Sequence, residues 1–453
     1  MEEKTFVDDI NRSVYDIKNE ENDSYRIKQG LTPEIVEKIS EEKHDPAWMR
    51  EFRLKSLEIY NNMQVPDWGP SIDGLNMDNI ATYVRANTNM KGDWKDVPEE
   101  IKDTFDRLGI PKAERESLAG VGAQYDSELV YHNVRKEVAD QGVVYTDMES
   151  ALTGEYADMV HEHFMKLITP QDHKFAALHG AVWSGGSFVY VPPGVSVEIP
   201  LQSYFRLNAP GAGQFEHTLI IVDEGAYLHF IEGCSAPKYN VANLHAGAVE
   251  LFVAKNAKLR YSTIENWSKN MYNLNTKRAT VAEGGKIEWV SGSFGSHVSY
   301  LYPMSILNGE RSSCEFTGIT FAGAGQNLDT GMKVVHNAPA TTSVVSTKSI
   351  SKGGGISTFR SAVTMTTKAK KSKSSVSCQS LMIDDISRSD TIPAMDIRVN
   401  DADVGHEATI GRISDDAVFY LMSRGIPEDD ARAMIVSGFA DNVSKELPLE
   451  YAM

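Results

Sequence analysis

"DEGAYLHFIEG" (Asp223–Gly233) begins as a turn and continues as a strand in which apolar and polar side chains alternate. The same design returns in three later stretches: AKNAKLRYSTIEN (Ala254–Asn266), AEGGKIEWVSGS (Ala282–Ser293) and LNGERSSCEFTG (Leu307–Gly318). The repeat recurs about every 25 to 31 residues, with no helical pattern between its strands. A degenerate repeat of this length predicts stacked β coils, a β-helix, with a two-sheet sandwich as the alternative.

Helical periodicity precedes this β region. The stretches AWMREFRLKSLEIYNNM (Ala47–Met63) and SALTGEYADMVHEHFMKLI (Ser150–Ile168) each predict a helix, because apolar residues recur at helical spacing. PEEIKDTFDRLGIPKAERESLAG (Pro98–Gly120) predicts two short helices separated at its Gly-Ile-Pro.

Helical signals return after the β region. Helix starts are expected at Ser414 and Pro427, since both precede acidic residues that favour the N-terminal end of a helix, and Gly425 and Gly438 are expected to mark the ends. The predicted organisation is an N-terminal helical or mixed region over residues 1–172, a β-helix core over 173–400 and a C-terminal helical region over 401–453.

Composition limits the function. The chain has 453 residues, 41% of them hydrophobic and 24% charged, which is ordinary for a globular protein. A net charge of −18 argues against nucleic-acid binding. The acidic N-terminus and the absence of a long apolar run predict no secretion signal and no membrane span, hence a cytoplasmic protein. FAGAGQNLDTG (Phe321–Gly331) lacks the Gly-Lys-Ser/Thr ending of a phosphate loop, so any ATP is hydrolysed by another subunit.

Two places carry chemistry-bearing residues. His406 and Glu407 resemble half of a zinc-protease helix, but Ile410 stands where the second histidine would be, which excludes the protease. Cys234 ends an alternating strand, and stacked coils would bring it near Arg206 and Lys277 from neighbouring repeats. Such basic neighbours are expected to lower the pKa of the thiol. Alone, each feature is more often structural than functional.

The blocks EGCSAPKYNVANLHAGAVEL, YSTIENW, NTKRA and GHEATIGRISDDAVFYLMSRGIPEDDARAMIVSGF closely resemble the SufB/SufD family, and specifically its SufB branch, through nearly the whole chain. The resemblance implies a right-handed parallel β-helix flanked by helical regions. It also implies an iron–sulfur cluster assembly scaffold that is not itself an enzyme and that holds a cluster transiently. Some complexes of the family bind reduced flavin, but the chain has no flavin motif.

The resemblance also implies partners. The C-terminal helices are expected to bind SufC, an ABC-type ATPase. The β-helix is expected to pair with SufD or with a second SufB copy. Sulfur is expected from the cysteine desulfurase SufS with SufE or SufU. Since family members often continue beyond PLEYAM, the C-terminus is expected to be incomplete.

The family's functional residues are expected at matching positions. Cys234 matches the cysteine that accepts sulfur, and the residues that match a sulfur path inside the β-helix are Arg206, Asn208, Trp267 and Lys277, with Glu265 standing where some members have Gln. His406 and Glu407 match the cluster-assembly pair.

One position departs from the family pattern. Well-studied members carry a cysteine where this chain has Ile397, and isoleucine cannot bind iron. Asp396 or a ligand from the partner is expected to substitute, ahead of Cys378. Two other functions stay open: a SufD-like structural partner without a cluster site, and a β-solenoid hydrolase using paired carboxylates.

Overall fold

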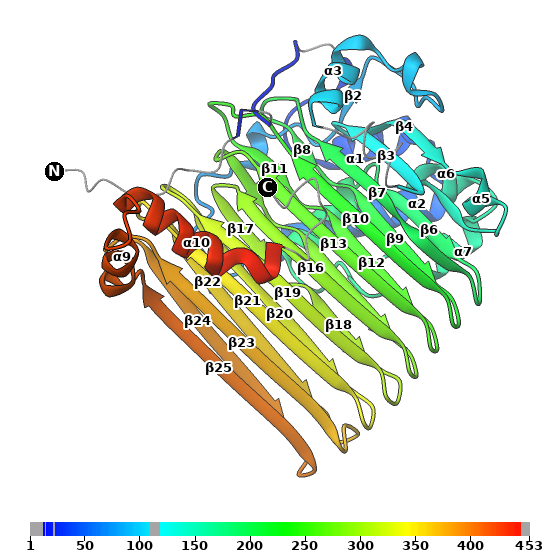
Figure 1. The fold of residues 1–453 in the computed structure, drawn as a ribbon. Coiled ribbons are helices and arrows are strands. Elements are labelled where there is room, and N and C mark those ends of the chain that lie inside the picture. Colours follow the sequence, from blue (N-terminus) through cyan, green and yellow to red (C-terminus); the bar gives the residue numbers. More distant parts are fainter. Residues whose placement is uncertain (1–11, 14, 21–22, 109–117, 445–453) are drawn as a thin grey trace.

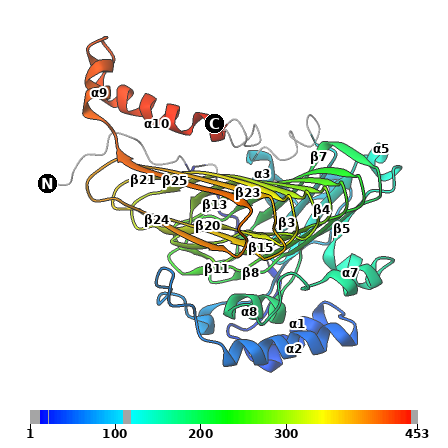
Figure 2. The ribbon, with the colours of Figure 1, turned by 90° about the horizontal axis from the view of Figure 1, so that it is seen from below.

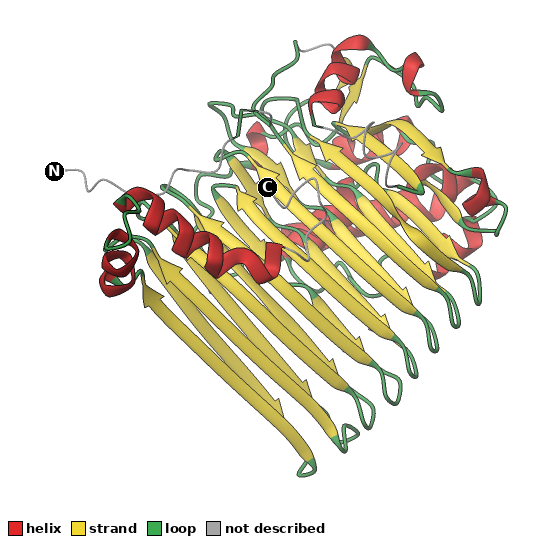
Figure 3. Cartoon of the chain, viewed as in Figure 1, coloured by secondary structure: helices red, strands yellow, loops and turns green. Residues whose placement is uncertain are grey.

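The protein is a β-solenoid of about eight turns with helical regions at both ends (Figures 1 and 3). The computed structural model describes residues 12–13, 15–20, 23–108 and 118–444, with side chains described as far as residue 441. Successive strands stack in parallel and advance along one axis, rather than forming two facing antiparallel sheets. The predicted β-helix is therefore confirmed, and the sandwich is wrong.

Two long sheets build the solenoid. The ten-stranded sheet contains, in spatial order, β25 (Ala402–Arg412), β23 (Ser372–Met382), β21 (Thr342–Ser351), β19 (Ser313–Ala322), β16 (Lys286–Gly295), β13 (Lys258–Trp267), β10 (Tyr227–Ser235), β7 (Ser196–Arg206), β3 (Gly120–Tyr125) and β4 (Glu128–Val134). The other sheet contains β5 (Val144–Asp147), β6 (Ser187–Val191), β9 (His217–Val222), β12 (Ala248–Val253), β15 (Thr276–Val281), β18 (Met304–Leu307), β20 (Asn327–His336), β17 (Val298–Leu301), β14 (Met271–Asn273), β11 (Asn243–His245) and β8 (Gly213–Gln214), continued from β20 by β22 (Ile356–Met365) and β24 (Arg388–Ile397). A separate pair joins β1 (Asp23–Arg26) to β2 (Val84–Ala86).

One turn of each coil has the same backbone conformation. A residue with positive φ recurs along one edge of the solenoid at Gly194, Gly225, Asn256, Gly284, Arg311, Ala340 and Lys371. These positions are 27 to 31 residues apart, which matches the repeat seen in the sequence. Glycine and asparagine adopt this conformation at low cost, so the turn dipeptides fix where each coil reverses.

The helices lie on opposite sides of the solenoid (Figure 2). On one side lie α1 (Pro33–Glu42), α2 (Ala47–Asn62), α7 (Ala157–His163) and α8 (Lys174–Val182), and on the other α9 (Asp415–Met422) and α10 (Glu428–Ser444). The remaining described helices are α3 (Glu99–Arg107), α5 (Lys136–Ala139) and α6 (Met148–Thr153), with short 3-10 turns η1 (Met77–Asn79) and η2 (Trp94–Asp96).

The helix predictions held in part. The helix expected over Ala47–Met63 is confirmed as α2, and the starts at Ser414 and Pro427 are confirmed by α9 and α10. The single helix expected over Ser150–Ile168 is wrong, because the chain breaks at Gly154 into α6 and α7. Gly438 lies inside α10 and does not end it.

Two further expectations concern a second helix within residues 98–120 and the C-terminal end of the solenoid. The second helix expected within Pro98–Gly120 falls mostly on residues outside the described part of the chain. The solenoid strands continue past residue 400, since β25 spans Ala402–Arg412 and α9 begins at Asp415.

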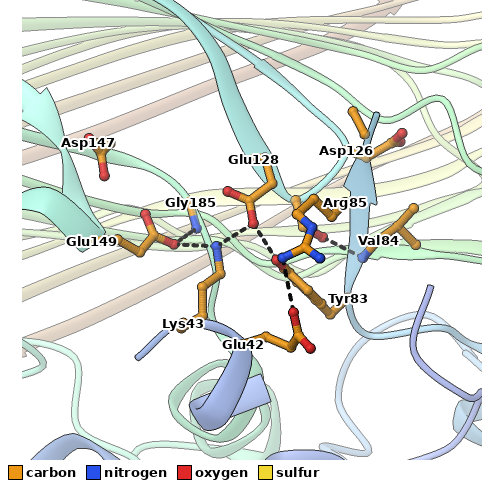
Figure 4. Close-up of polar contacts among 12 residues, drawn as sticks. Glu42, Lys43, Tyr83, Val84, Arg85, Asp126, Glu128, Asp147, Glu149 and Gly185 are labelled. Atoms are coloured by element: carbon orange, nitrogen blue, oxygen red, sulfur yellow. Dashed lines mark hydrogen bonds and ion pairs between the residues drawn. The ribbon is translucent and has the colours of Figure 1, made fainter. Parts of the chain in front are cut away.

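A buried ion cluster joins the N-terminal helices to the solenoid (Figure 4). The Lys43 ammonium lies 3.0 Å from a Glu128 oxygen and 2.8 Å from a Glu149 oxygen. Burial alone would lower the pKa of Lys43, but the two carboxylates outweigh burial and raise it. The backbone N–H of Gly185 donates to Glu149, and the Tyr83 hydroxyl donates to Glu128. Charges from β4, from α6 and from the residue that directly follows α1 are therefore satisfied together, which joins these helices to the sheet.

Candidate functional site

Cys234 lies inside the solenoid, on β10. Its side chain is 1% exposed, and its register partners are Phe205 on β7 and Glu265 on β13. Side chains alternate along a strand, so Cys234 shares the inward face of β10 with Glu232 and Phe230. The inward face is therefore apolar near the turn and becomes acidic and thiol-bearing toward the end of the strand.

Lys277 lies between two carboxylates beside this cysteine. Its ammonium is 2.9 Å from Glu232 Oε1 and 3.1 Å from Glu265 Oε1, and it donates to the Thr263 hydroxyl at 2.9 Å. Burial would lower the pKa of Lys277, but Glu232 and Glu265 outweigh it and raise the pKa. Burial raises the pKa of Glu265, but Lys277 and the other partners of Glu265 lower it overall. The three groups form a compensated buried ion cluster.

The acidic surroundings hold Cys234 as a thiol. Burial raises its pKa, and Glu232, Glu216 and Glu265 raise it further, whereas Lys277 lowers it. The net effect is a pKa well above the ordinary value for cysteine. The expectation that basic neighbours lower this pKa is therefore wrong, because burial and the three carboxylates together outweigh Lys277.

A second chain of hydrogen bonds leads from Glu265 to the other sheet. The Asn273 side-chain amide donates to Glu265, and its oxygen lies 2.7 Å from His245 Nδ1. His245 Nε2 contacts Glu216 Oε1, and the His245 ring lies 4.6 Å from the Trp267 ring. These partners come from β8–β9 and from β11, β13 and β14, so they meet only after the coils stack.

Sequence reasoning missed Glu232, Glu216, His245 and Asn273. A signal existed for Glu232, which lies two residues before Cys234 on a strand whose inward positions Leu228 and Phe230 are otherwise apolar. No comparable signal marked the other three, because their partners lie on different coils.

Arg206 and Asn208 lie at the border of this constellation. Arg206 is fully buried, donates to the Ser235 hydroxyl at 3.0 Å and to the Ile17 carbonyl at 2.6 Å. Burial lowers the pKa of its guanidinium. The Asn208 backbone N–H donates to Asp126 at 2.6 Å. Arg206 pairs in register with Ser235, one residue along from Cys234, whereas Asn208 lies two residues beyond the end of β7.

Two small cavities continue from the ion cluster inside the solenoid. The first, about 10 Å³, is lined by Glu265 and Lys277. The second, about 30 Å³, is lined by hydroxyl-bearing side chains of later coils, including Thr347, Ser349 and Ser380. Ser291, Leu301, Pro303 and Phe316 line both cavities. A partly polar interior therefore runs from the coil of Cys234 toward the C-terminal coils, with room for water-sized groups.

His406 and Glu407 lie on β25, the last strand of the solenoid, and not on a helix. His406 pairs in register with the buried Val376, whereas Glu407 pairs with Ser377. Because successive side chains of a strand point to opposite faces, His406 faces inward and Glu407 outward. His406 Nε2 has no hydrogen-bond partner among the described residues.

The same alternation separates Asp396 from Ile397. Ile397 pairs with the fully buried Met365 and so shares the inward face, whereas Asp396 pairs with Thr364 on the outward face. Arg398 binds the Asp396 carboxylate and lowers its pKa. Cys378 is 2% exposed and lies inward on β23, two residues beyond the register partner of His406. Strand geometry thus places Cys378, and not Asp396, on the face that His406 shares.

The solenoid ends open at this coil. β24 and β25 each pair with a neighbour on one side only. Their exposed apolar side chains are Ile392, Met395, Ile397 and Ile410, each 37 to 44% exposed. On α9, Phe419 and Tyr420 are 72% and 55% exposed. Unpaired edges and apolar surface together are typical of a surface that another chain covers.

Within residues 12–13, 15–20, 23–108 and 118–444, no group of three or more His, Cys, Asp or Glu side chains is arranged to hold a metal ion. His406 therefore needs further ligands from elsewhere to bind iron. No helix in the described part of the chain is both long and apolar enough to cross a membrane.

The β-solenoid thus has a partly polar interior and an open final coil. Two family models match it: the SUF system FeS cluster assembly SufBD core domain over residues 205–439, and the SufBD protein N-terminal region over 36–203. The chain belongs to the SufBD family of iron–sulfur cluster assembly proteins.

Relatives match over almost the full length. The chain is 49% identical to the iron–sulfur cluster assembly protein SufB of Bacillus subtilis (strain 168), over 98% of this chain and 96% of that protein. It is 47% identical, with the same coverage, to SufBD family proteins of Staphylococcus aureus (strain MRSA252) and Staphylococcus haemolyticus (strain JCSC1435). The resemblance inferred from sequence blocks is confirmed.

Proposed function

We propose that the chain is a SufB-type scaffold that accepts sulfur at Cys234, conducts it through the solenoid and assembles an iron–sulfur cluster at the open C-terminal coil. The observation that carries this proposal is the buried constellation of Cys234 with Glu232, Glu265 and Lys277, continued by cavities toward the last coils. Burying four ionisable groups of this kind carries a desolvation cost that an apolar core would avoid.

Sulfur transfer to Cys234 balances without an oxidant. As a donor persulfide binds, Cys234 loses its proton and its thiolate attacks the outer sulfur of the donor; the donor S–S bond breaks, and the donor thiolate takes up the proton. The raised pKa of Cys234 keeps it protonated until a donor arrives. Lys277 then stabilises the anionic persulfide, because its ammonium lies within the same ion cluster. Arg206, Asn208, Glu265 and Trp267 are the other residues of the proposed path.

The proposed cluster site is completed across an interface. His406 presents an unpartnered nitrogen on the inward face of the last coil, and iron, the cargo, is bound by imidazole, thiolate or carboxylate. Cys378 lies on that same face, whereas Glu407 and Asp396 lie outward and would bind iron only as ligands shared with a partner. A partner that covers β24 and β25, SufD or a second copy of this chain, supplies the remaining ligands.

The other partners are proposed on the basis of family membership. SufC is proposed to bind α9 and α10, which is supported by the exposed Phe419 and Tyr420. SufS with SufE or SufU is proposed as the sulfur donor. We assign the complex to the cytoplasm, supported by three cysteines that are all free. ATP hydrolysis belongs to SufC, and the chain acts as a scaffold and not as an enzyme.

Two measurements test this function. Sulfur loading from radiolabelled cysteine, with desulfurase and carrier, is expected to be lost in Cys234→Ser and kept in Cys314→Ser. Anaerobic reconstitution with ferrous iron and sulfide, followed by absorbance and EPR, is expected to fail in His406→Ala. Reconstitution of Asp396→Ala and Cys378→Ala decides which side chain replaces the cysteine that the family resemblance leads us to expect at position 397. Equal loading of the two serine variants would refute the role of Cys234.

Ile397 favours a second candidate, a SufD-like structural partner without its own cluster site. An isoleucine at position 397, on the inward face of β24, removes the thiolate expected there. Cluster reconstitution on the chain alone and with its partner separates the two functions. If the chain is only a structural partner, His406→Ala does not change the amount of cluster that forms.

A further inference from the structure

A large groove runs between α7 and the outer face of the solenoid. Its volume is about 700 Å³, within the range of protein ligand sites. The side of α7 that carries Met159 and Glu162 forms one wall, and turns of successive coils at Asp223 and Ala282 form the other. Figure 2 shows α7 beside the solenoid, away from α9 and α10. The groove is therefore remote from the open coil and from the interior sulfur path.

The rim of the groove is acidic. Glu155, Asp158, Glu162 and Asp223 line it, and neither lysine nor arginine does. Glu155, Asp158 and Glu162 form no ion pair with any residue that the structure describes. His163 also lines the groove, with its Nδ1 2.8 Å from the Met159 carbonyl.

Cations near the turn side are already occupied. Lys255 lies 3.4 Å from Glu283, and Arg311 contacts both Glu283 and Glu310. These two cations are therefore paired with carboxylates that do not line the groove.

The floor of the groove is apolar, which is unusual for the outer face of a sheet. Tyr190, Ile221 and Phe252 are register partners on β6, β9 and β12, and all three point outward and are half-buried. The Phe252 ring lies against His163, with 4.6 Å between ring centroids. A row of half-buried apolar side chains, bounded by acidic side chains, is typical of an interaction surface.

We propose that this groove docks a basic amphipathic segment of a partner protein, one that carries Lys or Arg beside aliphatic side chains. The carboxylates of the rim complement the cations, while the row of Tyr190, Ile221 and Phe252 buries the aliphatic groups. The acidic rim excludes nucleic acid. A basic turn of a second copy fits poorly, because the exposed lysines around Ala369 are accompanied by no exposed apolar side chain.

The binding probe is a fluorescein-labelled peptide of alternating leucine and lysine pairs at helical spacing, read by anisotropy with the full chain. The test variant is Glu155→Lys/Glu162→Lys; Asp158 is left in place because it stabilises the first turn of α7. The matched control is Asp67→Lys/Asp106→Lys, which makes the same charge change at exposed sites outside the groove.

The groove variant is expected to bind the peptide at least tenfold more weakly than the wild type, and the control variant within about twofold. The same peptide with glutamate in place of lysine is expected not to bind. Equal weakening in both variants, or equal binding of the glutamate peptide, overturns the proposal. Sedimentation velocity gives the second test: a self-association that Glu155→Lys/Glu162→Lys abolishes would assign the groove to a second copy instead. Thermal unfolding confirms that each variant is folded.

Discussion

Replacing Lys277 with methionine removes the one ammonium that compensates Glu232 and Glu265 inside the solenoid. The substitution keeps most of the side-chain volume, so packing changes little. Both carboxylates are within 3.1 Å of the lost charge, and all three side chains are at most 4% exposed. The variant therefore leaves two buried carboxylates with neutral hydrogen-bond donors only.

The magnitude follows from the cost of an uncompensated buried charge. Breaking such a pair costs about 3–5 kcal/mol. The folded variant can avoid the uncompensated charge by protonating one of the two carboxyl groups. Because the ordinary pKa of a glutamic acid is about 4.3, this protonation costs about 4 kcal/mol at pH 7, and the loss of stability cannot exceed that cost by much. The folded variant then binds a proton that the unfolded chain releases, so its stability falls as pH rises. The deficit is expected to shrink by about 1.4 kcal/mol per pH unit between pH 7 and pH 5.

Urea unfolding at pH 5, 6 and 7 measures this pH-dependent loss of stability. It is carried out on the wild type, on Lys277→Met and on the control variant Lys286→Met. Lys286 also contacts two carboxylates, Glu288 and Glu315, but its side chain is 31% exposed, and its loss is expected to cost less than about 1 kcal/mol. Equal losses in the two variants, or a Lys277→Met deficit that does not change with pH, would refute the reasoning.

Further predictions concern the backbone, a buried acid and the cysteines. Burial raises the pKa of Asp126 to about 7, so the free energy of unfolding falls by up to about 4 kcal/mol as pH rises from 4 to 7. Asp126→Asn is expected to remove this pH dependence, as measured by urea unfolding at pH 5 and 8. Parallel pH profiles of the wild type and the variant would contradict the prediction. Gly295→Ala places a Cβ 1.7 Å from the Trp267 carbonyl oxygen and is expected to lower the free energy of unfolding by more than about 3 kcal/mol. Gly194→Ala has open space around its Cβ and is expected to lower it by about 1–2 kcal/mol, because of the positive φ alone. Similar melting temperatures for the two variants would exclude this difference. Iodoacetamide is expected to label none of the three buried cysteines in the native protein and all three in urea, as counted by mass spectrometry; rapid native labelling would contradict their burial.

Local signals predicted the coils well. The turn at Gly225 and its counterpart at Asn256 require positive φ, and the strands between such turns alternate apolar and polar residues. Both properties depend on neighbours within a few residues, so they can be predicted from the sequence. The break between α6 and α7 was missed because Gly154 interrupts a continuous apolar pattern, and periodicity does not register the break.

The sequence by itself determined the repeat, the helical ends and, through its resemblance, the family and the candidate residues Cys234 and His406. Only the tertiary structure decided what surrounds them. Burial inside the solenoid and the carboxylates of Glu232, Glu216 and Glu265 raise the pKa of the Cys234 thiol, which reverses the direction expected from the sequence. Strand alternation separates His406 from Glu407, although they are adjacent in sequence. The physical reason is that a solenoid brings together residues one coil apart, while the chain places them about 30 residues apart.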